Sequence, residues 1–142
     1  MNLKLTLFSL AEANRMVEEL TPELKRLLLG KRELDQLDKR IAVLALASSG
    51  AAPNNPDALE LKPLVERRAM LGRQLASGVQ AIHHRGCLLK DLDKGLVDFY
   101  AVSGDRLIFL CWQLGEAEVT HWHPLEGGFS SRQPLDRSEL EE

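Results

Sequence analysis

The feature that most limits the fold of this chain is a regular repeat of apolar residues over positions 20–44. Their spacing of three, four or seven residues places these side chains on one side of a long helix, as in a coiled coil. Lys31 occupies the position between Leu27 and Leu34 at which the repeat would place an apolar residue. Most residues between them are charged, as on a helix face exposed to water. The apolar positions are Leu20, Leu24, Leu27, Leu34, Leu37, Ile41 and Leu44. They predict a helix that packs along a partner.

The same periodicity returns over positions 61–82, after a segment at 49–58 that is rich in glycine, proline and asparagine. Such a segment ends helices and forms a loop. The repeat closes at His83 and His84, whose positive charges would complement the end of a helix, and Gly86 suits the left-handed residue that follows it. The apolar positions are Leu61, Leu64, Val65, Leu71, Leu75, Val79 and Ile82. We therefore expect two helices in an antiparallel hairpin.

Several signals precede this repeat. Ser9 and Glu12 have the spacing of a capping box, in which each side chain accepts a backbone N–H. A Thr-Pro pair at Pro22 resembles a second helix start, so we expect the first helix to end or kink near Leu20. Alternation of apolar and polar residues over 3–7 favours a short edge strand.

The length of the predicted helices bears on assembly. A helix from Pro22 to about Ser48 would be about 40 Å long, at 1.5 Å per residue. This is longer than the compact core of a small protein requires. We therefore expect a second copy of the chain to bury part of the apolar repeat, which makes a homo-oligomer the predicted assembly.

The last third of the chain changes from helical to strand-like patterns. Short runs rich in β-formers are separated by turn sequences that suit an antiparallel meander. The runs cover residues 87–90, 96–102, 107–114 and 118–123. The predicted fold class is thus α+β, a long antiparallel helical hairpin packed with a small antiparallel β-meander. We expect a single domain over 1–142, with a helical part at 9–86, the loop at 49–58, the meander at 87–123 and a C-terminal loop and tail at 124–142.

Composition narrows the possible partners. With a net charge of −3 over 142 residues, the chain lacks the excess of basic residues that drives binding to nucleic acid. Its first residues lack the basic and apolar pattern of a secretion leader, and the sequence lacks the run of roughly 20 apolar residues that a membrane span needs. Cys87 and Cys111 are too few for a disulfide framework. We expect a cytoplasmic protein that binds neither nucleic acid nor membrane.

The sequence around Trp122 offers candidate metal ligands. His121 and His123 are two residues apart and would point the same way from a strand. With a carboxylate as third ligand they would suit zinc, iron or manganese. The candidate carboxylates are Asp91, Asp93, Asp98 and Glu116, and Cys87 could join a zinc site. Alternatively, one imidazole packs against Trp112 or Trp122 and donates to a backbone carbonyl, while the other faces water.

Asp98 lies between apolar residues of a predicted strand. A carboxylate in such a setting needs a partner, and Arg132 or a histidine would serve. Asp91 and Asp93 also fit a plain turn before Gly95. Cys111, in an apolar strand, is interpreted as a small core residue.

A second candidate site would bind an anion. Gly127 and Gly128 could form a backbone nest near Arg132, beside Trp112 and Trp122. Adjacent glycines also occur in ordinary turns, and the sequence shows no helix start behind them that would supply aligned N–H groups.

Three sequence motifs resemble an uncharacterised bacterial family, domain-of-unknown-function family 2203. They are "FSLAEANRM", "GCLLKDLDKGLVDFYA" and "CWQLGEAEVTHWHPLEGGFSSRQPL". The resemblance covers nearly the whole chain, and it implies no assigned activity, substrate or cofactor. His121 departs from the family pattern, in which this position is often aromatic. The family motif points to Asp91, Gly95, Asp98, Phe99, Trp112, Gly115, Glu116, Trp122, His123, Gly127, Arg132 and Pro134.

Three functions fit these observations. The leading one is a binding or interaction protein, oligomeric through its hairpin, whose polar cluster on the sheet binds a metal or a small anion. The second is a metal-dependent hydrolase that uses His121, His123 and a carboxylate. The third is a purely structural helical adaptor, in which replacing the polar residues of the sheet costs stability at most. No common nucleotide-binding or nucleophile motif occurs, so the sequence leaves open whether the protein is an enzyme.

Overall fold

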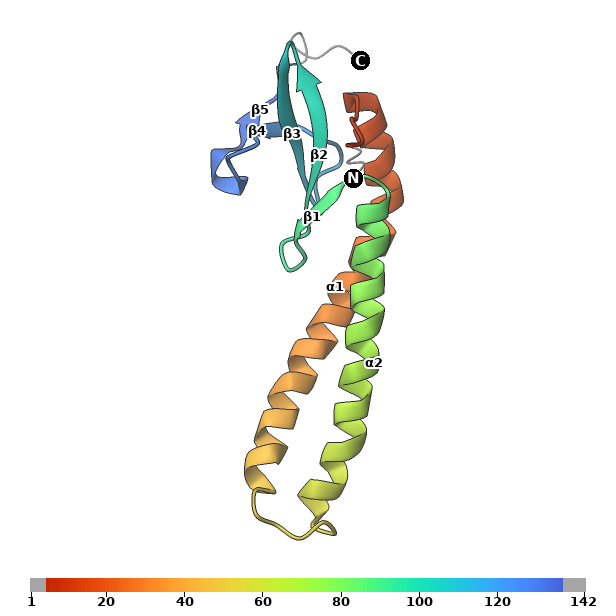
Figure 1. Ribbon diagram of the computed structural model, residues 1–142, viewed down its shortest axis with the longest axis vertical. Helices are drawn as coiled ribbons and strands as arrows, with labels where there is room; N and C mark the ends of the chain where they lie inside the picture. The colour runs from red at the N-terminus through yellow and green to blue at the C-terminus, as the bar shows by residue number, and fades with distance from the viewer. Residues whose placement is uncertain (1–4, 137–142) are drawn as a thin grey trace.

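Two long helices form one side of the molecule. The computed structural model describes residues 5–136. Helix α1 (Leu10–Ala47) and helix α2 (Pro56–His84) run antiparallel along each other (Figure 1). The loop between them covers 48–55, so the last residues of the loop predicted at 49–58 belong to the first turn of α2. The predicted helical hairpin is confirmed.

Helix α1 begins where the sequence predicts, but it does not end near Leu20. The Ser9 and Glu12 side chains form the capping box, with bonds of 3.0 and 3.1 Å to backbone N–H groups. Pro22 lies inside the continuous helix, so of the two expected outcomes, an end or a kink near Leu20, the end is wrong. Leu20 and Leu24 are both fully buried on either side of Pro22. Their burial outweighs the backbone hydrogen bond that proline removes.

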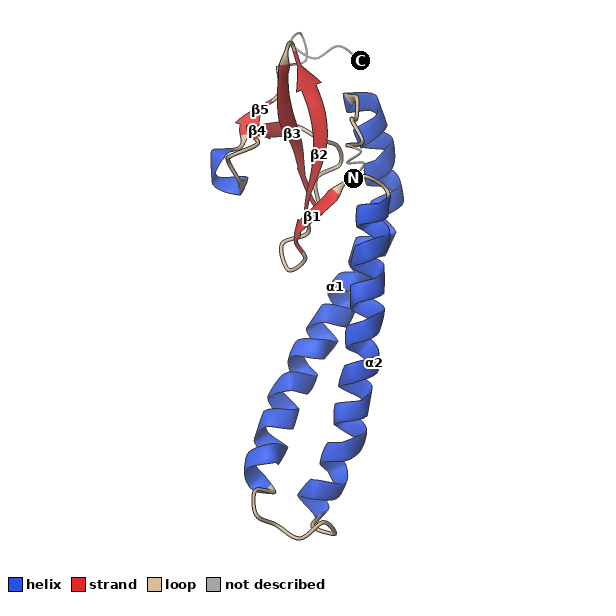
Figure 2. Cartoon of the chain, in the orientation of Figure 1, coloured by secondary structure: helices blue, strands red, loops and turns tan. Residues whose placement is uncertain are grey.

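The rest of the chain forms a five-stranded antiparallel sheet (Figure 2). The strands are β1 (Leu88–Asp91), β2 (Leu96–Ser103), β3 (Arg106–Gln113), β4 (His121–Pro124) and β5 (Gln133–Pro134). They are hydrogen-bonded in chain order, which confirms the predicted meander and the α+β class. Strand β5 lies in the region 124–142, which was predicted to be loop and tail.

The predicted edge strand at the start of the chain is only partly described. Positions 3 and 4 lie outside the described residues, and residues 5–7 are exposed and not in a strand. The Phe8 N–H donates to the Tyr100 carbonyl at 2.8 Å. Among the described residues 5–8, this one backbone hydrogen bond joins the segment to β2, and these residues form no ladder with it.

The sheet has two unlike faces. One face is apolar and packs on the helices, where its side chains join Leu20, Leu24 and Ile82 in the core. Its residues are Val97, Phe99, Ala101, Ile108, Leu110 and Trp112. Since side chains alternate along a strand, the residues between these point to the other face. Asp98, Cys111 and His123 are among them, and all three are buried.

The outer part of the hairpin is held mainly by contacts between its two helices. Ion pairs link them, at 2.9 Å for Arg67 to Glu33 and 2.9 Å for Arg40 to Glu60. These pairs are exposed, and such pairs contribute little to stability. Neither helix of the described chain has an apolar stretch that could cross a membrane.

Two glycines should respond in opposite ways to replacement by alanine. Gly86 ends α2 with a φ of 94°, and a Cβ there would collide with Thr6. We expect Gly86→Ala to lower the free energy of unfolding by about 1–2 kcal/mol, because a left-handed backbone disfavours a side chain. Gly72 lies inside α2 with open space around it. Gly72→Ala should raise stability by about 0.5–1 kcal/mol. Urea unfolding measures both changes, and equal signs would contradict the prediction.

Candidate metal centre

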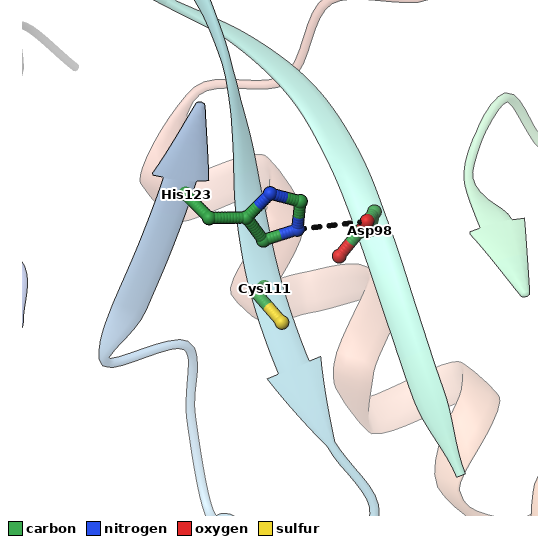
Figure 3. A group of neighbouring side chains, drawn as sticks. All are labelled: Asp98, Cys111 and His123. Carbon is green, nitrogen blue, oxygen red and sulfur yellow. Dashed lines mark hydrogen bonds and ion pairs between the residues drawn. The ribbon is translucent and has the colours of Figure 1, made fainter. Parts of the chain in front are cut away.

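Three neighbouring strands bring Asp98, Cys111 and His123 together on the face of the sheet that points away from the helices (Figure 3). Asp98 on β2 is directly opposite Cys111 on β3. His123 on β4 is opposite Phe109, two residues before Cys111 on the same strand. One ligand atom from each of the three side chains lies within 4.8 Å of the others. We refer to Asp98, Cys111 and His123 as the trio.

Hydrogen bonds fix the orientation of the His123 ring. Its Nδ1 lies 2.8 Å from the Pro124 carbonyl oxygen, and its Nε2 lies 3.0 Å from Oδ2 of Asp98. A carbonyl oxygen only accepts hydrogen bonds, so Nδ1 is the donor in the first contact. One further proton must then lie between Nε2 and Asp98. When that proton is absent, Nε2 presents a lone pair to the trio, the usual arrangement of a metal-binding histidine.

The thiol of Cys111 is not a ready nucleophile. Its burial raises the pKa to about 12, and the nearby charge of Asp98 acts in the same direction. The thiol is therefore protonated near neutral pH. The Nε2 atom of His123 is hydrogen-bonded to Asp98, so no free base is directed at the sulfur. This arrangement does not suit a Cys-His catalytic pair, but a bound metal ion would favour loss of the thiol proton.

His121 has different surroundings from His123. Its Nδ1 lies 2.8 Å from the Thr120 hydroxyl and 3.9 Å from a carboxylate oxygen of Glu116. The structure therefore does not bring His121 into the trio. The alternative proposed from sequence describes part of the arrangement, because one imidazole does donate to a backbone carbonyl. That ring, of His123, packs against Phe109 at 5.3 Å between centroids instead of against a tryptophan.

Arg132 pairs with Glu116 and not with Asp98. Its Nη2 donates to Glu116 at 2.6 Å and to the Cys111 carbonyl at 3.1 Å. Of the two partners considered for Asp98, the structure thus selects a histidine. Glu116 also accepts from the Gln113 N–H at 2.7 Å, and its own carbonyl accepts from the indole N–H of Trp112 at 2.8 Å. These contacts anchor the turn after β3 and leave Glu116 engaged with its neighbours.

The remaining candidates lie in turns. Asp91 accepts from the Lys94 N–H at 3.0 Å, as a turn residue does, and Asp93 reaches Lys31 at 3.4 Å. The Gly127 N–H donates to the Pro124 carbonyl at 3.0 Å, and the Gly128 N–H donates to the Ser131 hydroxyl at 2.9 Å. The two glycine amides are therefore already bonded within the loop.

Three other expectations have definite outcomes. A short 3₁₀ helix (Phe129–Ser131) follows Gly128, where no helix start was predicted. Trp122 is half-buried beside Arg106, whose guanidinium lies 5.7 Å from the ring centroid. Cys87 is buried with the hydrophobic core and is not part of the trio.

Comparison with known families identifies the chain. A family model described as an uncharacterised conserved protein, DUF2203, matches residues 6–135. The chain belongs to the DUF2203 family. No curated protein matches this DUF2203 chain. No solved structure matches it either.

A small cavity adjoins the trio of this DUF2203 protein. Its volume is about 100 Å³. It is lined by Lys90, Leu96, Asp98, Cys111, His123, Gly127, Gly128 and Phe129. The trio therefore has protein on one side and space for a small ligand on the other.

Cys111 as a ligand and Lys90 as a residue of the site were not predicted from the sequence. Cys111 lies in the apolar run "LIFLCW", where a small core residue is the ordinary interpretation. The signal that could have found it is the alternation along β3. Trp112 faces the core, so its neighbour Cys111 faces the side that carries Asp98 and His123.

Proposed function

We propose that this DUF2203 protein is a metal-binding protein whose trio, Asp98, Cys111 and His123, holds one divalent transition-metal ion. The observation that carries the proposal is the convergence of three different ligand atoms within 4.8 Å at a buried position. A tetrahedral ion with bonds of about 2.0–2.3 Å keeps its ligand atoms roughly 3.3–3.8 Å apart. The trio is therefore close to the spacing that such an ion needs.

The donor set favours some metals over others. A thiolate sulfur is a soft ligand, an imidazole is intermediate and a carboxylate is hard. This mixture suits zinc or iron(II), whereas manganese prefers oxygen ligands. Zinc is the first ion to test. A thiol ligand also requires a reducing compartment, so a cytoplasmic location is part of the proposal.

Hydrolysis is the second candidate function, and one observation favours it. Three protein ligands with a cavity beside them resemble catalytic zinc sites, which keep one position for water or substrate. Metal-bound water would be the nucleophile in such an enzyme. Among the described residues that line the cavity, however, Asp98 is the single carboxylate, and it is assigned to the metal. No separate general base is present among them, so binding is the better-supported function.

Metal analysis of the untagged protein tests the proposal. Elemental mass spectrometry after incubation with zinc should find about one ion per chain. Cys111→Ser keeps the shape of the side chain and should lower the zinc affinity more than about 100-fold. Replacing a residue that only hydrogen-bonds to a metal ligand already costs about 10–100-fold in affinity. His121→Ala is the matched control and should retain the metal. The proposal fails if the folded wild type binds neither zinc, iron(II) nor manganese, or if Cys111→Ser binds zinc as tightly.

We also propose that two or more copies associate through the outer hairpin. Large apolar side chains are exposed there, including Leu46 at 81% and Leu59 at 61%. Both lie in the helix turns next to the connecting loop. Sedimentation equilibrium should give a mass above 15.9 kDa for the wild type and close to 15.9 kDa for Leu46→Glu/Leu59→Glu. A wild type that sediments as a single chain would contradict association.

A further inference from the structure

We propose that the cavity beside the trio binds a small monoanion, held jointly by the bound metal ion and the ammonium group of Lys90. This inference rests on the proposed metal site and adds the class of its ligand. The cavity volume of about 100 Å³ suits a ligand of a few non-hydrogen atoms, since a space of about 10–15 Å³ on this measure already admits one water molecule.

Lys90 supplies a positive charge at the edge of this cavity. It lies on β1 where the register with β2 shifts, between Leu89 and Asp91. Its Nζ lies 4.9 Å from the centroid of the Phe109 ring, a cation–π contact. Within the described part of the chain, no carboxylate forms an ion pair with Lys90, unlike Lys31 and Arg132. Its charge is therefore available to a ligand in the cavity.

The balance of charges defines the ligand. A divalent ion bound by the carboxylate of Asp98, the thiolate of Cys111 and neutral His123 gives a centre with no net charge. Lys90 adds one positive charge, and a single negative charge on the ligand would compensate it. A monoanion is thus favoured over a dianion.

The cavity walls disfavour phosphate. The Gly127 and Gly128 N–H groups are used within their own loop, at 3.0 and 2.9 Å from their acceptors. Leu96 and Phe129 provide apolar surface. A tetrahedral oxyanion needs several donors, whereas a small carboxylate or azide needs only the metal and Lys90. The chemical class that fits is therefore a short monocarboxylate, of the size of formate or acetate.

Cobalt(II) allows metal binding by the trio and anion binding in the cavity to be tested separately. A Cys111-bound cobalt ion gives a sulfur-to-metal charge-transfer absorption, which reports that the trio holds metal. Acetate and azide, added at constant ionic strength, should then shift the ligand-field bands of cobalt in a saturable way. Lys90→Met keeps the length of the side chain and removes its charge, and it should weaken anion binding at least about tenfold.

Lys62→Met is the control, because Lys62 is exposed on α2 and lies outside the residues that line the cavity. It should bind the anions as the wild type does. A cobalt-loaded protein whose bands do not respond to acetate or azide would overturn this inference and leave the metal site intact. An equal response in Lys90→Met would overturn the role of Lys90. Absence of the charge-transfer band in the wild type would instead refute the metal site itself.

Discussion

Replacing Asp98 with alanine is expected to lower the free energy of unfolding of the metal-free protein by about 3–5 kcal/mol. Asp98 and His123 are 3% and 2% exposed, and Nε2 of His123 lies 3.0 Å from the carboxylate of Asp98. Removal of the carboxylate leaves the buried imidazole without this partner. An unpaired buried polar group loses its solvation and gains no replacement bond. Chemical denaturation of the apoprotein measures the change.

Two variants make this prediction specific. Asp98→Asn keeps the shape of the side chain and can donate an amide N–H to Nε2, so it should cost clearly less than alanine. Asp93→Ala removes an exposed carboxylate whose contact with Lys31 is 3.4 Å, and it should change stability by less than about 1 kcal/mol. If Asp98→Ala were no more destabilising than Asp93→Ala, the buried pair would not stabilise the fold.

The apparent affinity for a divalent ion is expected to rise about tenfold for each pH unit while the free Cys111 thiol is protonated. Burial raises the pKa of this thiol to about 12. A metal ion displaces the thiol proton, so a higher pH favours the bound form. Calorimetry in buffers of different ionisation enthalpy counts the protons released, and zinc titration at several pH values gives the slope.

Cys111→Ser tests the origin of this dependence. The hydroxyl of serine keeps its proton, so the variant should release about one proton fewer per metal ion than the wild type, and its affinity should rise about tenfold less for each pH unit. His121→Ala should release as many protons as the wild type. A pH-independent affinity in the wild type would show that the metal does not displace protons from the trio.

Much of the fold is predictable because its main pattern is periodic. The helical repeat identifies the face of each helix that meets the core, and Leu20, Leu24 and Ile82 on those faces are fully buried. Pro22 led to the wrong prediction of a helix end, because the helix propensity of proline alone does not show that buried leucines on both sides stabilise the helix. Strand β5 was missed because it has only two residues and carries a proline.

The site was harder to predict because it depends on register across strands. Asp98 stood out as a charge among apolar residues, and its need for a partner was clear from the sequence. Which partner it meets depends on how β2, β3 and β4 align, and a shift of one residue would move Cys111 to the opposite face. His121 and His123 share a face, but residues two apart are separated by about 6.6 Å along a strand. Only one of them can therefore contact Asp98.

The one-sided position of the sheet on the hairpin has a practical consequence. Along α1, Lys31 contacts the sheet turn at Asp93, and the helix continues to Ala47, about 24 Å further at 1.5 Å per residue. The connecting loop at 48–55 is thus remote from the trio, and several of its residues are exposed. A fluorescent or affinity label inserted in that loop would report on the protein while leaving its metal chemistry undisturbed.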